Sequence, residues 1–230
     1  MSRCIVQAVT CPACGASQQE KLFVSVNGAR ITEAADRIID GAWGQWSCLN
    51  CGASEVLDTP LLFSDLPGGL WIVQRDRSER DRFAALEKEA DAIFQREFIE
   101  RPPPAIRDQA LRVKRRLCFG RAQLADKLLA HREGIDDCGL ECLKLVLTRD
   151  YLQELYPFGP VEFHLKQADA KALRLHAMTL AGAGPVLEVC VSREKFDAIA
   201  EDRQSFQEPF ADLFSGLYVN ASRYLGDGVT

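Results

Sequence analysis

The chain has 230 residues and a formal net charge of −5. Hydrophobic residues make up 47% and charged residues 27%, which is ordinary for a globular protein and excludes a disordered or fibrous chain. The acidic balance disfavours general binding to phosphate backbones. No apolar run approaches about 18 residues, and the N-terminus has no signal-peptide pattern, so we expect a cytoplasmic protein with no membrane span.

Two short cysteine motifs stand near the N-terminus, CPACG from Cys11 and CLNCG from Cys48. Each offers two thiols three residues apart, and thiolates suit Zn²⁺, which takes four ligands in a tetrahedron. The glycine after each second cysteine allows a turn with positive φ. Redox pairs and reduced bystander cysteines are the alternatives, but two such motifs favour a metal site. The sequence therefore predicts one structural Zn²⁺, bound by Cys11, Cys14, Cys48 and Cys51.

Motifs for catalysis are sparse in this sequence. It has no phosphate-binding G-x-x-x-x-G-K-[ST] loop, no G-x-G-x-x-G after a strand and no G-x-S-x-G elbow. A catalytic zinc keeps an open coordination position, whereas four cysteines close the shell. We therefore predict no catalytic residues, no cofactor besides zinc and no enzymatic activity. An enzyme that acts through unpatterned residues is left as an alternative.

The segments around the cysteine motifs predict a small sheet with a helical insert. Alternating apolar residues predict a strand over Gln18–Val26. A short helix is expected to begin at Thr32 and to end at Gly41. Two apolar segments, 56–63 and 70–74, are separated by Pro67-Gly68-Gly69 and predict a hairpin.

These residues resemble the bacterial CpXC domain, which is named for its paired cysteine motifs. The resemblance rests on CPACG, on an insert that ends near Asp40-Gly41, on CLNCG, and on TPLLFSD and LWIVQ. It covers about Cys11 to Arg75 and extends more weakly over the later segments. Leu49 stands where such motifs often carry proline, and this departure leaves the four ligands intact. The family is functionally uncharacterised, so the resemblance implies a zinc site and the fold but no activity.

A charged helix over Arg77–Ile99 is predicted next, and Pro102-Pro103-Pro104 ends it. Consecutive prolines favour an extended, stiff path, so we place the domain boundary there. The prediction is a CpXC-like zinc-ribbon domain with a trailing helix over 1–100, and a helical plus antiparallel-sheet part over 101–230.

A basic amphipathic helix is predicted over Ile106–Ala130, with Arg112, Arg115 and Arg116 on the face opposite its apolar stripe. Such a helix can bind phosphates or an acidic partner. Because the C-terminal part is rich in acids, pairing within the chain is the preferred interpretation. A nucleic-acid-associated zinc-ribbon protein that uses the basic helix around Arg112–Arg121 is the alternative function.

A helix after Gly134 carries Cys138 and Cys142 one turn apart. With His131 or Cys118 they could hold a second metal, but they coincide with an apolar stripe, where cysteine is commonly buried as a small hydrophobe. The role of these three cysteines is left open.

From Pro160 the apolar residues alternate, which predicts a three-stranded antiparallel meander with turns at 168–171 and 181–184. By the same alternation His164 and His176 are expected to point outward. Ser192 is expected to cap a helix. The apolar segment Phe210–Leu225 is either a packed terminal element or part of a partner surface.

Together these patterns predict an α+β fold, with a zinc-ribbon-like N-terminal sheet that carries a helical insert, followed by helices and the meander. The predicted function is that of a zinc-binding, non-catalytic cytosolic protein that serves as a protein-interaction or scaffold module. We expect an unknown protein partner. The sequence does not define its identity, the pathway or the oligomeric state.

Overall fold

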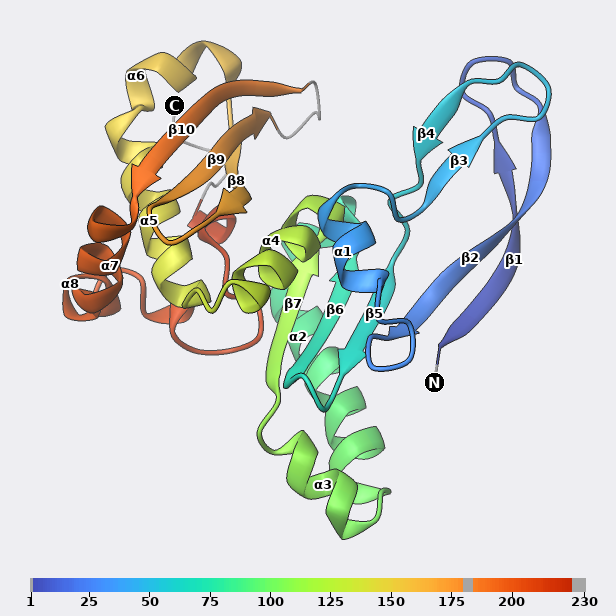
Figure 1. The fold of residues 1–230 in the computed structure, drawn as a ribbon, viewed down its shortest axis with the longest axis horizontal. Coiled ribbons are helices and arrows are strands. Elements are labelled where there is room, and N and C mark those ends of the chain that lie inside the picture. Colours follow the sequence, from blue (N-terminus) through green and yellow to red (C-terminus); the bar gives the residue numbers. More distant parts are fainter. Residues whose placement is uncertain (1, 180–183, 225–230) are drawn as a thin grey trace. The chain divides into compact units, whose positions relative to one another are not determined.

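The computed structural model describes residues 2–179 and 184–224. The α+β fold class is confirmed, and the chain divides into two compact units, Met1–Leu124 and Ala125–Thr230 (Figure 1). This division lies later than the expected boundary at 100/101, because strand β7 (Lys114–Phe119) pairs with β6 (Leu70–Arg75) and so belongs to the first unit. Each unit is described by itself.

Unit 1 is built on a five-stranded sheet with the order β1-β2-β5-β6-β7. Strand β1 (Arg3–Thr10) pairs antiparallel with β2 (Ser17–Asn27), and β5 (Leu61–Asp65) pairs antiparallel with β6, as the predicted hairpin requires. Only Ser25–Asn27 of β2 pair with β5, in parallel. The rest of β1 and β2 therefore forms a two-stranded ribbon beyond the sheet (Figure 1).

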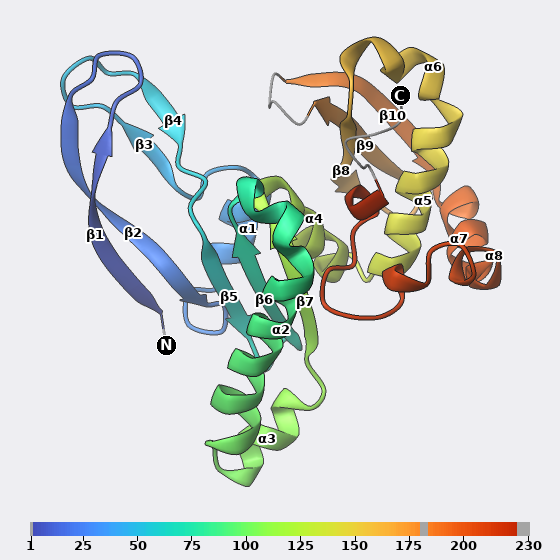
Figure 2. The ribbon, with the colours of Figure 1, turned by 180° about the vertical axis from the view of Figure 1, so that it is seen from behind.

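A second, short hairpin lies beside this ribbon (Figures 1 and 2). It consists of β3 (Gln45–Ser47) and β4 (Ser54–Val56). Neither these strands nor β1 follow from the sequence patterns. The two strands of the hairpin have three residues each, and most residues of β1 are exposed on both faces, so the apolar alternation that marks a half-buried strand is missing.

Helices cover both faces of the central strands of unit 1. Helix α1 (Ala34–Ile39) lies on one face of β5 and β6, and α2 (Phe83–Phe94) lies on the other (Figures 1 and 2). The predicted helix over 77–99 is confirmed, with a 3-10 turn at Arg77–Arg82 before α2 and a π-helical turn at Gln95–Glu100 after it. Trp71 is fully buried and packs edge-on against Phe94, with the ring centroids 5.1 Å apart.

The predicted basic helix over 106–130 is wrong. Helix α3 (Pro104–Ala110) ends early, β7 follows it, and α4 (Gly120–Arg132) begins only at Gly120, where φ is 78°. Apolar residues on either side of the strand happen to fall at helical spacing. The pairing with β6, a partner distant in sequence, decides the conformation instead. Arg115 and Arg116 therefore lie on a strand.

Unit 2 contains the predicted three-stranded meander. Its sheet has the order β10-β9-β8, with β8 (Val161–Ala168), β9 (Ala172–Thr179) and β10 (Pro185–Ser192) all antiparallel. The turn expected at 181–184 lies outside the described residues except for Gly184. The helical elements of this unit are the later part of α4, α5 (Asp137–Asp150), α6 (Leu152–Leu155), η3 (Tyr156–Phe158), α7 (Arg193–Glu201), α8 (Arg203–Gln207), η4 (Ala211–Leu213) and η5 (Ala221–Tyr224).

The structure tests two further expectations for this unit, one through a hydrogen bond and one through burial. The Ser192 hydroxyl caps α7 by accepting from the Lys195 N–H at 3.2 Å, as predicted. The segment after Phe210 is packed, since Leu213 and Tyr218 are fully buried; Leu225 lies outside the described residues.

The outward position expected for His164 is wrong. His164 is only 1% exposed, and its Nδ1 lies 3.1 Å from Asp126 Oδ2. All of Val161–Leu165 is buried, so alternation along β8 does not separate an inner from an outer face. His176, its partner on β9, is half-buried and has Nε2 3.3 Å from Glu188 Oε2.

Candidate metal centre

The two cysteine motifs form the connections of two hairpins and have the same backbone structure. Cys11 N–H donates to Ala16 C=O at 2.8 Å, and Gly15 N–H donates to Cys11 C=O at 2.9 Å. The second motif repeats both bonds at the same distances, from Cys48 to Ala53 and from Gly52 to Cys48. Gly15 and Gly52 have φ of 72° and 74°, a conformation that costs glycine little and other residues more. The sequence CxxCG thus folds identically twice.

This arrangement brings the four predicted cysteines together. Their Sγ atoms all lie within 4.8 Å of one another. The closest contacts run between the motifs, 3.7 Å from Cys11 to Cys51 and 3.7 Å from Cys14 to Cys48. Four sulfurs at about 2.3 Å from a tetrahedral zinc would be about 3.8 Å apart, whereas a disulfide joins its sulfurs at about 2.05 Å. The spacing fits a metal ion held by four thiolates.

One side of the sulfur cluster is buried and the other is open to solvent. Cys11 and Cys48 are buried with Trp46 in a small apolar cluster, against which Val9 and Leu57 also pack. Cys14 and Cys51 are exposed. The first cysteine of each motif therefore fixes the site to the core of the hairpins, and the second faces solvent.

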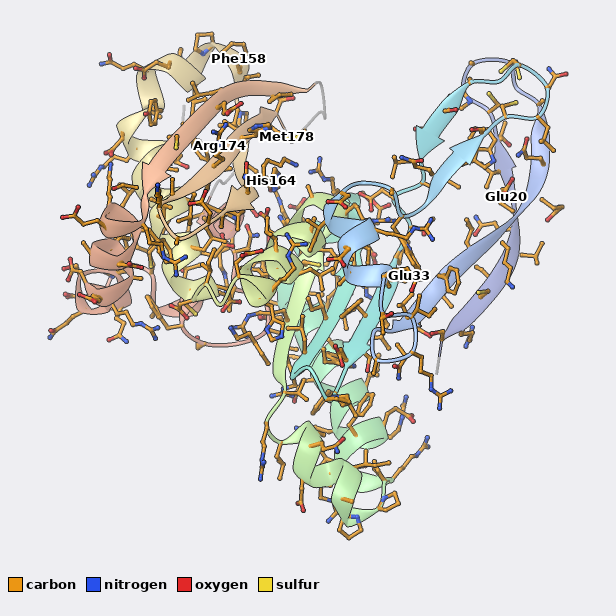
Figure 3. All side chains as sticks on the ribbon, viewed as in Figure 1. Glu20, Glu33, Phe158, His164, Arg174 and Met178 are labelled. Carbon is orange, nitrogen blue, oxygen red and sulfur yellow. The ribbon has the colours of Figure 1, made fainter. Side chains whose placement is uncertain are left out.

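Polar side chains of β2 hold the second hairpin against the first. Gln18 donates from Nε2 to Ser47 C=O at 3.1 Å and accepts from Leu49 N–H through Oε1 at 2.9 Å. Glu20, labelled in Figure 3, accepts from Trp46 Nε1 at 3.1 Å. Sequence reasoning missed both residues. Their only signal is that they are polar and two positions apart on a strand that begins beside the first motif.

A family model described as CpXC protein matches residues 9–144 of this chain. The match includes both cysteine motifs and more than half of the sequence. The chain belongs to the CpXC family. The resemblance noted from the motifs is thus confirmed, and the matched region continues beyond unit 1 into α5 of unit 2. Comparisons with curated proteins and with solved structures gave no match.

The thiols of the CpXC site differ in acidity. Asn50 Nδ2 donates to Cys14 Sγ at 3.5 Å, and this bond is the main cause that lowers the pKa of Cys14 from 9.0 to about 6. For Cys51 the Ala53 N–H favours the thiolate, but the neighbouring Cys14 sulfur, partial desolvation and the sulfurs of Cys11 and Cys48 together outweigh it and raise the pKa to about 12. Four negative sulfurs this close together require a cation, and a bound divalent ion would keep all of them deprotonated.

The other cysteines considered for a metal do not join this site. Cys118 and Cys142 are buried, and burial raises the pKa of Cys142 to about 12. Cys138 Sγ lies 3.4 Å from Leu213 C=O. Among the described residues, neither His131 nor Cys118 forms a ligand group with Cys138 or Cys142.

A second group of possible ligand atoms lies at the start of α5, where Asp136, Asp137 and Cys138 approach one another within 4.8 Å. Asp136 caps the helix by accepting from Gly139 N–H at 2.9 Å and pairs with Arg203 at 2.8 Å. Asp137 lies 3.9 Å from Lys127 Nζ. The chain itself therefore supplies partners for both carboxylates.

Proposed function

We propose that this CpXC protein binds one structural Zn²⁺ through Cys11, Cys14, Cys48 and Cys51. The observation that carries the proposal is the pair of 3.7 Å sulfur contacts between two motifs of identical backbone structure. A tetrahedron of four thiolates suits zinc or iron, and zinc is the usual ion of closed structural sites. Besides the proposed metal, a small apolar cluster around Cys11 and Cys48 and the hydrogen bonds of Gln18 and Glu20 join these hairpins.

Metal analysis of the purified protein tests this assignment. We expect about one zinc per chain, and its loss in the variant Cys11→Ser/Cys48→Ser. Cys190→Ser is the matched control, because Cys190 is a free, exposed cysteine on β10. A double variant that keeps its zinc would refute the ligand assignment, and stoichiometric iron in place of zinc would refute the choice of metal.

We further propose that the site is non-catalytic. Four sulfur ligands leave no open coordination position for water or substrate, which a catalytic zinc requires. The metal then supplies folding energy, and the role of the protein lies in its surfaces.

Contact with another protein is the role we propose for those surfaces. Leu49, within the second cysteine motif, is 88% exposed. In unit 2, three large apolar side chains follow one another along α6 and η3 (Figure 3 labels the last), with exposures of 54%, 79% and 49% for Leu152, Tyr156 and Phe158. Grouped apolar side chains exposed to water favour a protein contact. These surfaces support an interaction or scaffold module, whose cytoplasmic location is part of the proposal.

A comparative pull-down tests the role of α6 and η3. The wild-type protein and the variant Leu152→Ser/Tyr156→Ser are immobilised in parallel. Leu111→Ser is the control, because Leu111 is an exposed leucine (69%) outside this segment. We expect one protein to be enriched by the wild type and the control and to be absent with the double variant. Equal enrichment by all three would remove this segment from the proposed interface.

The nucleic-acid alternative has less support. Arg121 is 9% exposed and donates to Trp43 C=O at 2.7 Å and to Leu57 C=O at 2.9 Å. Arg115 pairs with Asp91 and has its guanidinium 4.9 Å above the ring of Phe94. Both arginines thus have partners within unit 1.

No helix formed by the described residues has the length and apolar character needed to cross a bilayer.

A further inference from the structure

A chain of buried charges runs through unit 2. Lys127 Nζ binds Glu141 Oε1 at 2.7 Å, and Glu141 Oε1 also accepts from Lys144 Nζ at 3.1 Å. Lys144 Nζ in turn binds Asp126 Oδ2 at 2.7 Å, and the same oxygen lies 3.1 Å from His164 Nδ1. His164 Nε2 in turn faces Glu162 Oε2 at 3.5 Å.

The charges in this cluster do not balance. The carboxylates are those of Asp126, Asp137, Glu141 and Glu162, and the ammonium groups are those of Lys127 and Lys144, all buried. The carboxylates outnumber the ammonium groups by two in a region of low dielectric, where excess negative charge is costly. A bound cation would offset this excess.

His164 has the arrangement of a metal ligand. Metal-binding histidines commonly donate one ring N–H to a carboxylate, which fixes the tautomer and leaves the other nitrogen for the ion. Here Asp126 holds Nδ1, and Nε2 has no hydrogen-bond partner among the residues that the structure describes.

The distance from His164 Nε2 to Glu162 Oε2 also fits. A zinc ion about 2.0–2.2 Å from both atoms, with a tetrahedral angle between them, places nitrogen and oxygen about 3.4 Å apart. The observed 3.5 Å matches this value and is long for a direct hydrogen bond. A proton on Nε2 would therefore bridge the two side chains less well than a metal ion.

A small pocket with polar and apolar walls lies at this point. Its polar lining comes from Lys144 and Thr148 of α5, from Glu162 and His164 of β8, and from Asn220 and Ser222 at the start of η5; Phe163 and Ala221 also line it. Its space is about that of one water molecule, which also suits one small ion. Lys144 opposes a cation there, but its ammonium is already bound to Asp126 and Glu141. Figure 3 labels His164 on β8.

We propose that His164 Nε2 and Glu162 bind a divalent transition-metal ion in unit 2, with Asp126 as the positioning residue for His164. Imidazole and carboxylate suit zinc and related ions, and oxygens of Ser222, Thr148 or water complete the coordination shell. This site is separate from the four cysteines, and it does not rest on their function.

The test loads full-length protein with Zn²⁺ and removes unbound ion before metal analysis. We expect two zinc ions per chain for the wild type and one for His164→Asn, whose amide can still donate to Asp126 but which lacks a nitrogen at the Nε2 position. His176→Asn is the matched control on the neighbouring strand and should keep two. Asp126→Asn should weaken the second ion about 10- to 100-fold, as expected for a group that orients a ligand.

A readout on the wild type keeps the test independent of how the variants fold. Co²⁺ bound by thiolates gives intense sulfur-to-metal charge-transfer absorption, whereas Co²⁺ on imidazole and carboxylate gives none. We expect one equivalent of each kind. A wild type that holds a single ion, lost in Cys11→Ser/Cys48→Ser, would overturn this inference and leave the proposed cysteine site standing. A single ion that survives in Cys11→Ser/Cys48→Ser and is lost in His164→Asn would instead refute the proposed cysteine site and leave this inference standing.

Discussion

The cysteine hairpins of unit 1 and the charge cluster of unit 2 both bring together groups that repel one another. The two regions differ in where the compensating positive charge comes from. Around Cys11 and Cys48 the apolar cluster is small, and the groups that shift the pKa of Cys14 and Cys51 include no lysine or arginine. In unit 2 the carboxylates lie in an extensive core, and Lys127 and Lys144 are buried among them. The proposed zinc would therefore come to the hairpins from solution, whereas Lys127 and Lys144 supply counter-charge to unit 2 from within the chain.

This difference can be measured because the two units carry different chromophores. The three tryptophans, Trp43, Trp46 and Trp71, all lie in unit 1, and the four tyrosines all lie in unit 2. Tryptophan fluorescence thus reports unit 1 alone. The tyrosine signal in near-ultraviolet circular dichroism reports unit 2 once the overlapping tryptophan signal is subtracted. Each prediction below changes one unit and uses the other as an internal reference.

Removal of the metal should have the largest effect. Structural zinc contributes on the order of 10–16 kcal/mol to the folding of small modules, so a strong chelator should unfold the hairpins β1–β2 and β3–β4. Trp46, beside Cys11 and Cys48, should report the change in fluorescence. Hydrogen exchange should show loss of protection over residues 3–56 and retained protection in β8 and β9. Hairpin amides that stay protected after chelation would show that the metal is dispensable for folding.

Breaking the charge cluster should come next. Lys144→Met leaves Asp126 and Glu141 without their shared ammonium, and removal of one partner from a buried pair costs about 3–5 kcal/mol. Urea denaturation followed by the tyrosine signal should show this loss in unit 2. Lys195→Met is the control, because Lys195 is more than half exposed and 3.9 Å from Asp150, and it should cost less than about 0.5 kcal/mol. Equal stability of both variants would mean that the buried pairs contribute nothing.

Acid should weaken unit 2 through Asp126. Its pKa falls from 3.8 in the unfolded chain to about 2 in the folded one, so its contribution is present above pH 4 and is lost as the pH falls through 2. The shift corresponds to about 2 kcal/mol. Urea titrations at pH 7, 4 and 2 should show the decrease, and Asp126→Asn should flatten it. A wild type and variant with parallel pH profiles would contradict this role of Asp126.

The smallest effect is expected from Arg112, Arg115 and Arg116 on and before β7. Replacing all three with glutamine removes the contacts of Arg115 with Asp91 and Phe94 and should destabilise unit 1 by about 1 kcal/mol. Partner binding through unit 2 should be unchanged. About three phosphate contacts would give a salt slope of only about −2 to −3, so any nucleic-acid binding should vanish near physiological salt. Tight, salt-resistant binding lost in the triple variant would restore the nucleic-acid interpretation.

The parts of this fold that the sequence predicted are those with local signals. Two glycine-ended cysteine motifs indicate the ligands without any knowledge of the hairpins that join them, and their Sγ atoms do come together. The meander follows from alternation that continues over three strands, because Leu173, Leu175 and Ala177 are buried on one face. Ser192 followed by a charged turn is enough to mark the start of α7.

The parts that could not be predicted depend on distant partners. Strand β7 is extended because β6 pairs with it, and α4 begins where Gly120 turns the chain; the positions of Leu117 and Leu124 fit a helix equally well. Alternation along β8 predicts an outward His164, because a polar residue between Phe163 and Leu165 usually faces solvent. Its actual neighbour, Asp126, lies on α4, and nothing local shows that this side of β8 is covered by a polar interior.

The length of strand β2 means that a small bend near its pairing with β5 moves the cysteine motifs by a larger distance. One continuous strand runs from Ser17, at the first cysteine motif, to Asn27, and only its last three residues are fastened to β5. The part of β2 that does not pair with β5 begins at Ser17 and ends at Val24. At about 3.4 Å per residue it is about 27 Å long, so a bend of about 10° at Ser25 moves its far end by about 5 Å. A partner that binds near Leu49 would therefore exert torque on the three-residue junction, and a small change in strand twist at β5 would be amplified at the exposed face of the sulfur cluster.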